Sequence, residues 1–315
     1  NIGVDLTVST TNIQKKYFTW TTNFNISHNR NKIEALSGEP FFLEEANFGY
    51  NQKTHKIEVG KPVGQFYGYR TIGLYQVEDF DYDASTGKYT LKEGVPGAAD
   101  RSSVQPGMWK FADITPDGVI DENDKTVIGN AMPDFYGGLN NTFKYKGWDM
   151  SIFFSFNYGA EVLNATKLTN SKAGKENYNV LDVVNSSKRW MTIDADGKVV
   201  TDPEQLAMLN AGKSVASIHD MQDGDRFIHS WAVEDASFLR LSNVSIGYSL
   251  HKKALRGIGL QKLRFYFTGN NLFVWTPYTG FDPEVSTMGN GLTPGVDFGA
   301  YPRNRSFVFG VNITL

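Results

Sequence analysis

The sequence predicts an all-β protein, and specifically an antiparallel β-barrel that spans a membrane. Three observations support this class. Apolar and polar residues alternate through several long segments, aromatic residues make up 14% of the 315 residues, and the mean hydropathy is only −0.36. Strict alternation places the apolar residues on one face of a strand and the polar residues on the other. A transmembrane barrel turns the apolar face to lipid and the polar face to a wet interior.

The clearest strand signal is the segment 148–158. One face carries Trp148, Met150, Ile152, Phe154, Phe156 and Tyr158, and the other carries Asp149, Ser151, Phe153, Ser155 and Asn157. We expect Ile152, Phe154 and Phe156 to point toward lipid. Ser151, Ser155 and Asn157 should then point into the barrel. The same alternation, stronger or weaker, predicts strands at residues 2–10, 18–26, 135–145, 238–250, 263–273 and 307–315.

The length of these segments separates a membrane barrel from a soluble sandwich. They run for 9–13 residues, whereas soluble strands average about 5–6 and a tilted spanning strand needs about 9–11. Aromatic residues that prefer a membrane interface lie near the expected strand ends. These are Tyr17, Tyr145, Trp148, Tyr158 and Trp275.

The connections alternate between short and long. Short turns are expected at residues 12–15 and 144–148 and a medium turn at 251–261, whereas 31–132, 159–232 and 276–304 are long. Outer-membrane barrels have short periplasmic turns and long extracellular loops. This parity gives seven spanning strands and a periplasmic C-terminus. Residues 65–76 look like an eighth strand, which would break the parity, so we assign them to the extracellular region.

Seven strands cannot close a barrel of the usual even count, and open sheet edges are not tolerated in lipid. We therefore expect this chain to be part of a larger barrel, with other strands upstream. The first residues have neither a basic start nor an apolar stretch, so they do not form a signal peptide. A processed or truncated start is the interpretation that follows.

Helices are expected only in the long connection 159–232. Asp202 is a suitable N-cap before Pro203, and Gly212 is a suitable end for that helix. Residues 179–190 are a second candidate.

The sharpest chemical motif is an acidic twelve-residue loop from Asp113 to Asp124. Its spacing is that of an EF-hand-type calcium loop, in which oxygen ligands wrap around a hard cation. The candidate ligands are the side chains of Asp113, Thr115, Asp117, Asp121 and Asp124 and the carbonyl oxygen of Val119. Gly118 permits the sharp turn, but Asp124 replaces the usual glutamate and Pro116 removes an N–H. The sequence predicts structural calcium here, and the alternative is an acidic turn held by Asx hydrogen bonds.

Other classes of function lack support in the sequence. A net charge of −3 provides no basic surface for nucleic acid. The absence of Cys excludes disulfides, thiolate metal sites and cysteine nucleophiles. The five His residues show no metal-binding or catalytic spacing. We therefore expect that the protein is not an enzyme.

Several stretches resemble the SusC/RagA family of TonB-dependent outer-membrane transporters. The most specific is GNNLFVWTPYTGFDPEVS at 269–286, and VEDASFLRLSNVSIGY at 233–248 resembles another strand of the family. The final strand at 301–315 and the acidic loop with the following TVIGNAMPDF at 126–135 are also similar. The resemblance covers nearly the whole chain. One departure is Leu315, where the family more often ends in an aromatic residue.

The resemblance implies a 22-stranded barrel with an N-terminal plug, in the outer membrane of a Gram-negative bacterium. It implies import of oligosaccharides or oligopeptides, delivery by a SusD-like surface lipoprotein that caps the barrel, and energy supplied through TonB. Residues 1–315 would be the C-terminal portion of that barrel, without signal peptide, TonB box, plug domain or first strands.

A second class remains open at this stage. A soluble all-β carbohydrate-binding or adhesion module with structural calcium would also explain the aromatic residues and the acidic loop. It would not explain seven long strands with one lipid-like face. Trp190, Trp231 and Tyr278 could stack on sugar rings, but packing within the loops is the favoured interpretation.

Overall fold

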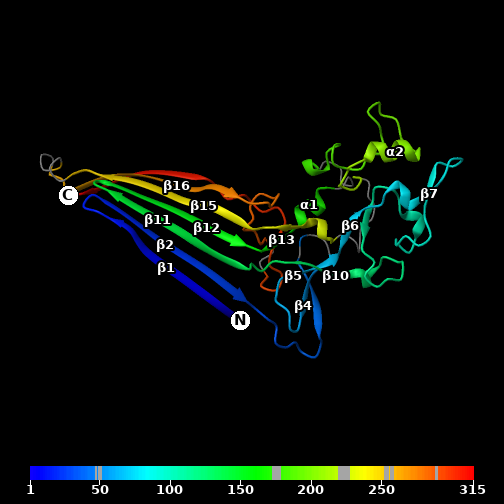
Figure 1. Cartoon of the computed structure of the whole chain (residues 1–315), viewed down its shortest axis with the longest axis horizontal. Helices are drawn as coiled ribbons and strands as arrows, with labels where there is room; N and C mark the ends of the chain where they lie inside the picture. Colours follow the sequence, from blue (N-terminus) through cyan, green and yellow to red (C-terminus); the bar gives the residue numbers. More distant parts are fainter. Residues whose placement is uncertain are drawn as a thin grey trace.

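The computed structural model describes residues 1–315 except 47, 49–51, 172–178, 219–227, 252–254, 256–258 and 288–289. It has two parts (Figure 1). A long, twisted sheet of extended strands forms one part, and a body of shorter strands, loops and helices lies beyond one end of this sheet.

The long sheet is antiparallel throughout and contains seven strands in the order β1-β2-β11-β12-β15-β16-β18. Their bounds are Ile2–Gln14 for β1, Phe18–Arg30 for β2, Phe135–Tyr145 for β11, Trp148–Tyr158 for β12, Phe238–Ser249 for β15, Lys262–Trp275 for β16 and Ser306–Thr314 for β18. The predicted count of seven is confirmed, and the bounds of β11 and β12 match the sequence prediction. Within the described residues, β1 pairs only with β2 and β18 pairs only with β16, so the sheet has two edges.

Short turns lie at the end of the sheet where the chain finishes, and the N-terminus lies nearer the other end (Figure 1). β11 and β12 are joined by Lys146 and Gly147, and Lys146 has a positive φ of 53°. Its N–H donates to the Tyr17 carbonyl oxygen at 3.0 Å, which ties this hairpin to the β1–β2 turn. Part of the predicted turn 251–261 lies outside the described residues.

The long connections fold together at the opposite end. Their first sheet has the order β10-β5-β4-β3, formed by Lys125–Asn130, Gln65–Tyr69, Lys53–Glu58 and Phe41–Glu45. Two further antiparallel pairs are β6 (Thr71–Leu74) with β9 (Trp109–Phe111) and the hairpin of β7 (Phe80–Asp83) with β8 (Lys88–Leu91). A three-stranded sheet joins β14 (Val233–Asp235), β13 (Glu161–Asn164) and β17 (Val296–Asp297). Residues 65–76 therefore belong to this body and not to the long sheet, as predicted.

In the described part of the connection after β12 lie two α-helices. The first is α1, Ala165–Thr169, which the sequence did not predict. The second is α2, Pro203–Asn210, whose N-terminus is capped by Asp202 accepting from the Gln205 N–H, as expected. The predicted helix at 179–190 was wrong, since the segment contains only a short 3-10 turn at Asp182–Val184. Among the described residues, no helix is long and apolar enough to cross a bilayer.

The buried cores lie in the loop body. One core combines residues from all three long connections: Ala46, Phe48, Phe66, Leu163, Ala165, Leu168, Ile228, Ala232 and Val296. Large apolar side chains of the long sheet, in contrast, are extensively exposed, including Ile2, Phe265 and Phe309. The connections therefore fold as one unit, whereas the sheet leaves a broad apolar surface uncovered.

Candidate functional site

The pairing register gives the long sheet two chemically different faces. Directly opposed residues of an antiparallel pair lie on the same face. Phe154 is opposite Leu139 and Leu241, Leu139 is opposite Phe24, and Leu241 is opposite Phe273. The grouping predicted for Phe154 therefore extends across neighbouring strands as an apolar row. The same face also carries two polar residues beside Ile152, since Thr22 Oγ1 donates to Asn141 Oδ1 at 2.7 Å.

The other face is polar, and its middle carries no formal charge. We call two adjacent rows of this face the neutral belt. The first row is Ser9, Asn23, Asn140, Phe153, Asn243, Asn270 and Ser306, and the second is Thr11, Thr21, Thr142, Ser151, Ser245, Thr268 and Val308.

Side chains of the neutral belt bond to one another across strands. Ser151 Oγ donates to Asn140 Oδ1 at 2.9 Å, and Asn243 Nδ2 donates to Asn270 Oδ1 at 2.7 Å. Asn270 Nδ2 then donates to Ser306 Oγ at 3.0 Å. These bonds give amide and hydroxyl groups of the neutral belt hydrogen-bond partners on neighbouring strands.

Charged residues of the polar face lie on either side of the neutral belt. Toward the short turns, Arg264 donates to both carboxylate oxygens of Asp149, at 3.0 and 2.5 Å. Gly247 lies beneath this guanidinium, since a Cβ there would be 2.3 Å from Arg264 Nη2. Toward the loops lie Arg240 and, at the β1 edge, Asp5. The belt is therefore a neutral zone between two charged ones.

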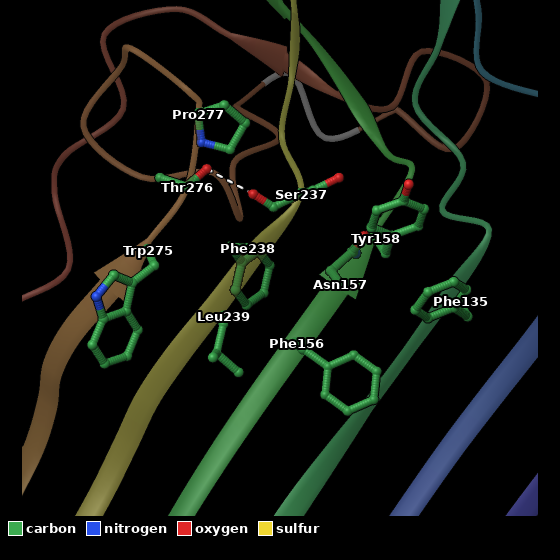
Figure 2. Close-up of a pocket in the computed structure, with 10 residues that line it drawn as sticks. All are labelled: Phe135, Phe156, Asn157, Tyr158, Ser237, Phe238, Leu239, Trp275, Thr276 and Pro277. Atoms are coloured by element: carbon green, nitrogen blue, oxygen red, sulfur yellow. Dashed lines mark hydrogen bonds between the residues drawn. The ribbon is translucent and has the colours of Figure 1, made fainter.

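Aromatic residues mark the ends of the apolar face. Tyr17, Tyr145 and Trp148 are about half exposed at the short-turn end, and so are Tyr158 and Trp275 at the loop end. Near Tyr158 and Trp275, a pocket of about 430 Å³ is lined by aromatic and aliphatic side chains of neighbouring strands (Figure 2). Its upper rim is closed by the hydrogen bond from Thr276 Oγ1 to the Ser237 carbonyl oxygen, 2.8 Å long. This distribution matches the aromatic bands predicted from the sequence.

A buried ion-pair network joins the sheet to the last long connection. Arg240 of β15 lies 2.7 Å from Asp282 Oδ1 and 2.9 Å from Glu284 Oε2. Arg303 completes the network with Glu284 Oε2 at 3.0 Å. The sequence analysis did not identify this network. Its signal was an arginine in an otherwise uncharged strand together with two acids in the next connection, but only the tertiary structure brings them together.

The acidic loop is closed by its own backbone. Asp124 Oδ1 accepts from the N–H groups of Ile114 and Thr115 at 2.8 and 3.1 Å, and Asp124 Oδ2 accepts from the Asp121 N–H at 2.9 Å. Burial raises the pKa of Asp124, but these hydrogen bonds outweigh it and the pKa lies below its usual value. This carboxylate therefore acts as the central acceptor of the turn.

The other candidate ligands of the loop are placed around this turn. Asp113 Oδ2 accepts from the Gly118 N–H at 2.9 Å, while its Oδ1 is buried without a hydrogen-bond donor. Asp117 and Asp121 each cap a backbone N–H two residues ahead, belonging to Val119 and Asn123. Within the described ranges, no group of three or more His, Cys, Asp or Glu side chains is arranged to hold a metal ion. Calcium at this loop stays a prediction.

The three aromatic loop residues considered for sugar stacking are packed inside the loop body. Trp190 is 2% exposed and lies directly over Gly107, and Tyr278 is 5% exposed with its hydroxyl donating to Asp297 Oδ2 at 2.6 Å. Trp231 stacks near His229 and beneath the Lys167 ammonium, 4.2 Å from the ring centroid. Loop packing, the favoured interpretation, accounts for all three.

We compared the chain with known protein families, sequences and solved structures. No family model matches the chain. The chain is 33% identical to TonB-dependent receptor P3 of Formosa agariphila over 99% of its own length and 28% of that receptor. It is 26% identical to TonB-dependent receptor SusC of Bacteroides thetaiotaomicron over 99% of its length and 26% of SusC. The solved structure of the RagAB peptide transporter aligns with a TM-score of 0.67 at 21% identity, over 99% of this chain and 29% of that one.

The two-faced sheet with loops gathered at one end has the architecture of a transmembrane β-barrel wall. More particularly, the chain is related over almost its whole length to TonB-dependent receptors of the SusC/RagA type. The chain spans about 28% of the length of receptor P3. These relatives are named as receptors and transporters, not as enzymes, which agrees with the expectation that this chain performs no catalysis.

Proposed function

We propose that this chain forms part of the wall and extracellular loops of an outer-membrane transporter that is energised through TonB. The observation that carries the proposal is the long sheet itself. Its strands of 9–14 residues match the length required to cross a bilayer at a tilt. One face is mainly apolar and the opposite face holds an uncharged polar belt, as a lipid-facing and water-lined wall requires.

The orientation follows from the connections. The short turns would face the periplasm and the loop body the extracellular side. The names of the relatives support the role of TonB and of transport: SusC is named a TonB-dependent receptor, and RagAB is described as a peptide importer. A SusD-like surface lipoprotein and TonB are the proposed partners, and oligosaccharides or oligopeptides the proposed cargo.

The proposed protein is larger than the described sheet. Two sheet edges, at β1 and β18, would be paired by further strands of a barrel of about 22 strands, the number that the family resemblance implies. Residues 1–315 would be its C-terminal portion. In the loop body, the acidic turn at 113–124 is proposed to bind one structural calcium through Asp113, Asp117, Asp121 and the other predicted ligands.

Cell fractionation and uptake together test this function. The full-length gene, tagged and returned to a deletion strain, should yield a protein that is recovered in the outer membrane. The protein should resist extraction by high salt and alkali, and it should dissolve only in detergent. The deletion strain should lose uptake of at least one oligosaccharide or peptide, and a TonB-deficient strain should lose the same uptake. Release without detergent would instead indicate a soluble binding or adhesion module.

A further inference from the structure

An arginine lies at the loop end of the apolar face. Ile26 of β2 is on that face, opposite Leu6, and Arg30 is on the same face four residues further toward the loop body, opposite Ile2. Arg30 is exposed, and it forms no ion pair with any of the described residues. A positive charge thus borders the surface that would face lipid, without a counter-charge from this part of the chain.

Two lysines add positive charge at the same end of β2. The Ile33 N–H donates to the Lys61 carbonyl oxygen at 3.0 Å, which holds the turn at Lys61 beside the chain that leaves β2. Lys32 and Lys61 are both exposed. The one acid paired with these residues in the described ranges is Glu34, which lies 3.8 Å from Lys32 Nζ and is 82% exposed. We call Arg30, Lys32 and Lys61 the cationic cluster, and its charge exceeds that of Glu34.

An apolar pocket lies on the same face, further from the loop body. One row of directly opposed residues contains Ile26, Gly137, Phe156, Leu239 and Trp275. Phe156, Leu239 and Trp275 also line the 430 Å³ pocket described above (Figure 2). We call it the aromatic pocket. Since Ile26 lies in the row of the pocket and Arg30 beyond it, the charges are nearer the loops and the apolar lining is nearer the centre of the sheet.

The missing parts of a barrel would cover neither feature. β2 is paired on both sides, by β1 and β11, so a further strand would lie beyond β1 and not over Arg30. The aromatic pocket lies on β11, β12, β15 and β16, and each of these strands also has two neighbours. A domain inside the barrel would contact the opposite, polar face. The apolar face of these strands is therefore the side that meets the membrane.

The spacing of the two features fits one lipid molecule. Four residues along β2 separate Arg30 from the row of the pocket, which is about 13 Å at 3.3 Å per residue. Two strand spacings, about 10 Å, separate β2 from Phe156 on β12. The direct distance is then about 16 Å, close to half of the ~30 Å hydrocarbon core, which one extended acyl chain crosses.

A phosphorylated lipid has the matching chemistry. Arginine and lysine bind phosphate through charge-assisted hydrogen bonds, and a cation close to a membrane surface contributes about 1 kcal/mol to binding of anionic lipid. We propose that the cationic cluster binds the phosphate of an outer-leaflet lipid and that an acyl chain of the same lipid occupies the aromatic pocket. This proposal rests on the proposed function, because it requires the apolar face to lie in the outer membrane.

The test uses the full-length receptor, purified in detergent and freed of bound lipid. Native mass spectrometry measures binding of dipalmitoyl phosphatidic acid, of dipalmitoylglycerol, which lacks the phosphate, and of inorganic phosphate, which lacks the chains. Phosphatidic acid should bind most tightly. Arg30→Gln combined with Lys61→Gln should weaken its binding about thirtyfold, which corresponds to about 2 kcal/mol for two cations. The same variant should bind dipalmitoylglycerol as the unmodified receptor does.

Leu239→Ala tests the aromatic pocket and should weaken binding of both lipids. The matched control for the cationic cluster is Lys15→Gln combined with Lys16→Gln, which removes two exposed cations at the opposite end of the sheet and should leave the affinity for phosphatidic acid unchanged.

Four results would overturn the proposal: equal losses in the two double variants, equal binding of phosphatidic acid and dipalmitoylglycerol, unchanged binding of both lipids in Leu239→Ala, or displacement of phosphatidic acid by millimolar inorganic phosphate. Each of these leaves the transport function intact. A receptor recovered outside the outer membrane would instead contradict the proposed function.

Discussion

Arg240 Nη2 donates to Asp282 Oδ1 at 2.7 Å, and the two side chains are only 4% and 5% exposed. This pair joins the polar face of β15 to the connection that precedes β18. Breaking a buried pair leaves an uncompensated charge, which costs about 3–5 kcal/mol. The pair therefore holds the last connection against the sheet.

Replacing Arg240 should loosen this connection. In Arg240→Met, Asp282 and Glu284 keep only Arg303, and we expect the free energy of unfolding to fall by about 3–5 kcal/mol. Urea unfolding of the full-length receptor in detergent measures this change. Arg303→Met is the control, since Arg303 is 45% exposed and should cost less than about 1 kcal/mol. Equal effects would argue against a special role for Arg240.

His55 makes the loop body sensitive to acid. Burial lowers the pKa of His55 to about 4, against a weaker opposing effect of its hydrogen bond to the Pro294 carbonyl oxygen. Nε2 must donate to that carbonyl at 2.9 Å, so Nδ1 accepts from Thr54 Oγ1 at 2.8 Å and the ring is neutral. Above pH 6.5 the His55 ring is neutral in both the folded and the unfolded chain, so the folded state loses no stability to protonation of His55. As the pH falls from 6.5 to 4, the unfolded chain binds the proton first and roughly 3 kcal/mol of stability is lost.

Thermal unfolding of the loop body between pH 7 and pH 4 measures this loss. His55→Gln should be less stable at pH 7 and should show a flatter dependence on pH over the same range. An identical pH dependence in both proteins would exclude His55 as the titrating group.

Neighbouring residues of β12 should tolerate charge very differently. Phe154→Arg would place a guanidinium on the apolar face and should destabilise the barrel by about 2–4 kcal/mol. Ser155→Arg would place it on the polar face and should be milder. Unfolding in lipid vesicles compares the two variants, and a larger effect of Ser155→Arg would reverse the assigned faces.

Calcium at the acidic loop should be detectable as a gain in stability. Millimolar calcium should raise the unfolding temperature of the receptor, and Asp117→Asn should remove that increase, because Asp117 is exposed and caps only the Val119 N–H. Asp124 is unsuitable for this test, since its carboxylate closes the turn by itself. A well-resolved structure in calcium should show oxygen ligands at about 2.3–2.6 Å. A structure with only water at that position would contradict calcium binding.

The two edges of the sheet predict how residues 1–315 behave alone. Each unpaired N–H or C=O group in hydrocarbon costs several kcal/mol. Over two edge strands the total exceeds a domain's net stability of about 5–15 kcal/mol. Expressed without other strands, residues 1–315 should aggregate and fail to insert into vesicles. Recovery of a closed, detergent-soluble barrel from this chain alone would contradict the prediction.

Alternation along the chain was sufficient to predict the seven long strands, because a strand's two faces repeat every two residues and the apolar set at 148–158 fits no other period. The cap at Asp202 was predictable for a similar reason, since one side chain satisfies a backbone donor three residues away. The predicted helix at 179–190 failed because its residues pack by tertiary contacts, with Trp190 inserted over Gly107.

Contacts between side chains of different strands could not be predicted from local sequence patterns. Alternation placed Phe153 on a polar face but could not show Gly138 beneath it, because the register between β11 and β12 sets that contact. Arg240 and Asp282 are likewise 42 residues apart and become partners only when the last long connection folds back. The sequence by itself determined the strands and their two faces, because side-chain alternation is a local property of extended backbone. Tertiary structure decided which rows form the neutral belt and which charges are buried together, because register and loop packing depend on contacts distant in the chain.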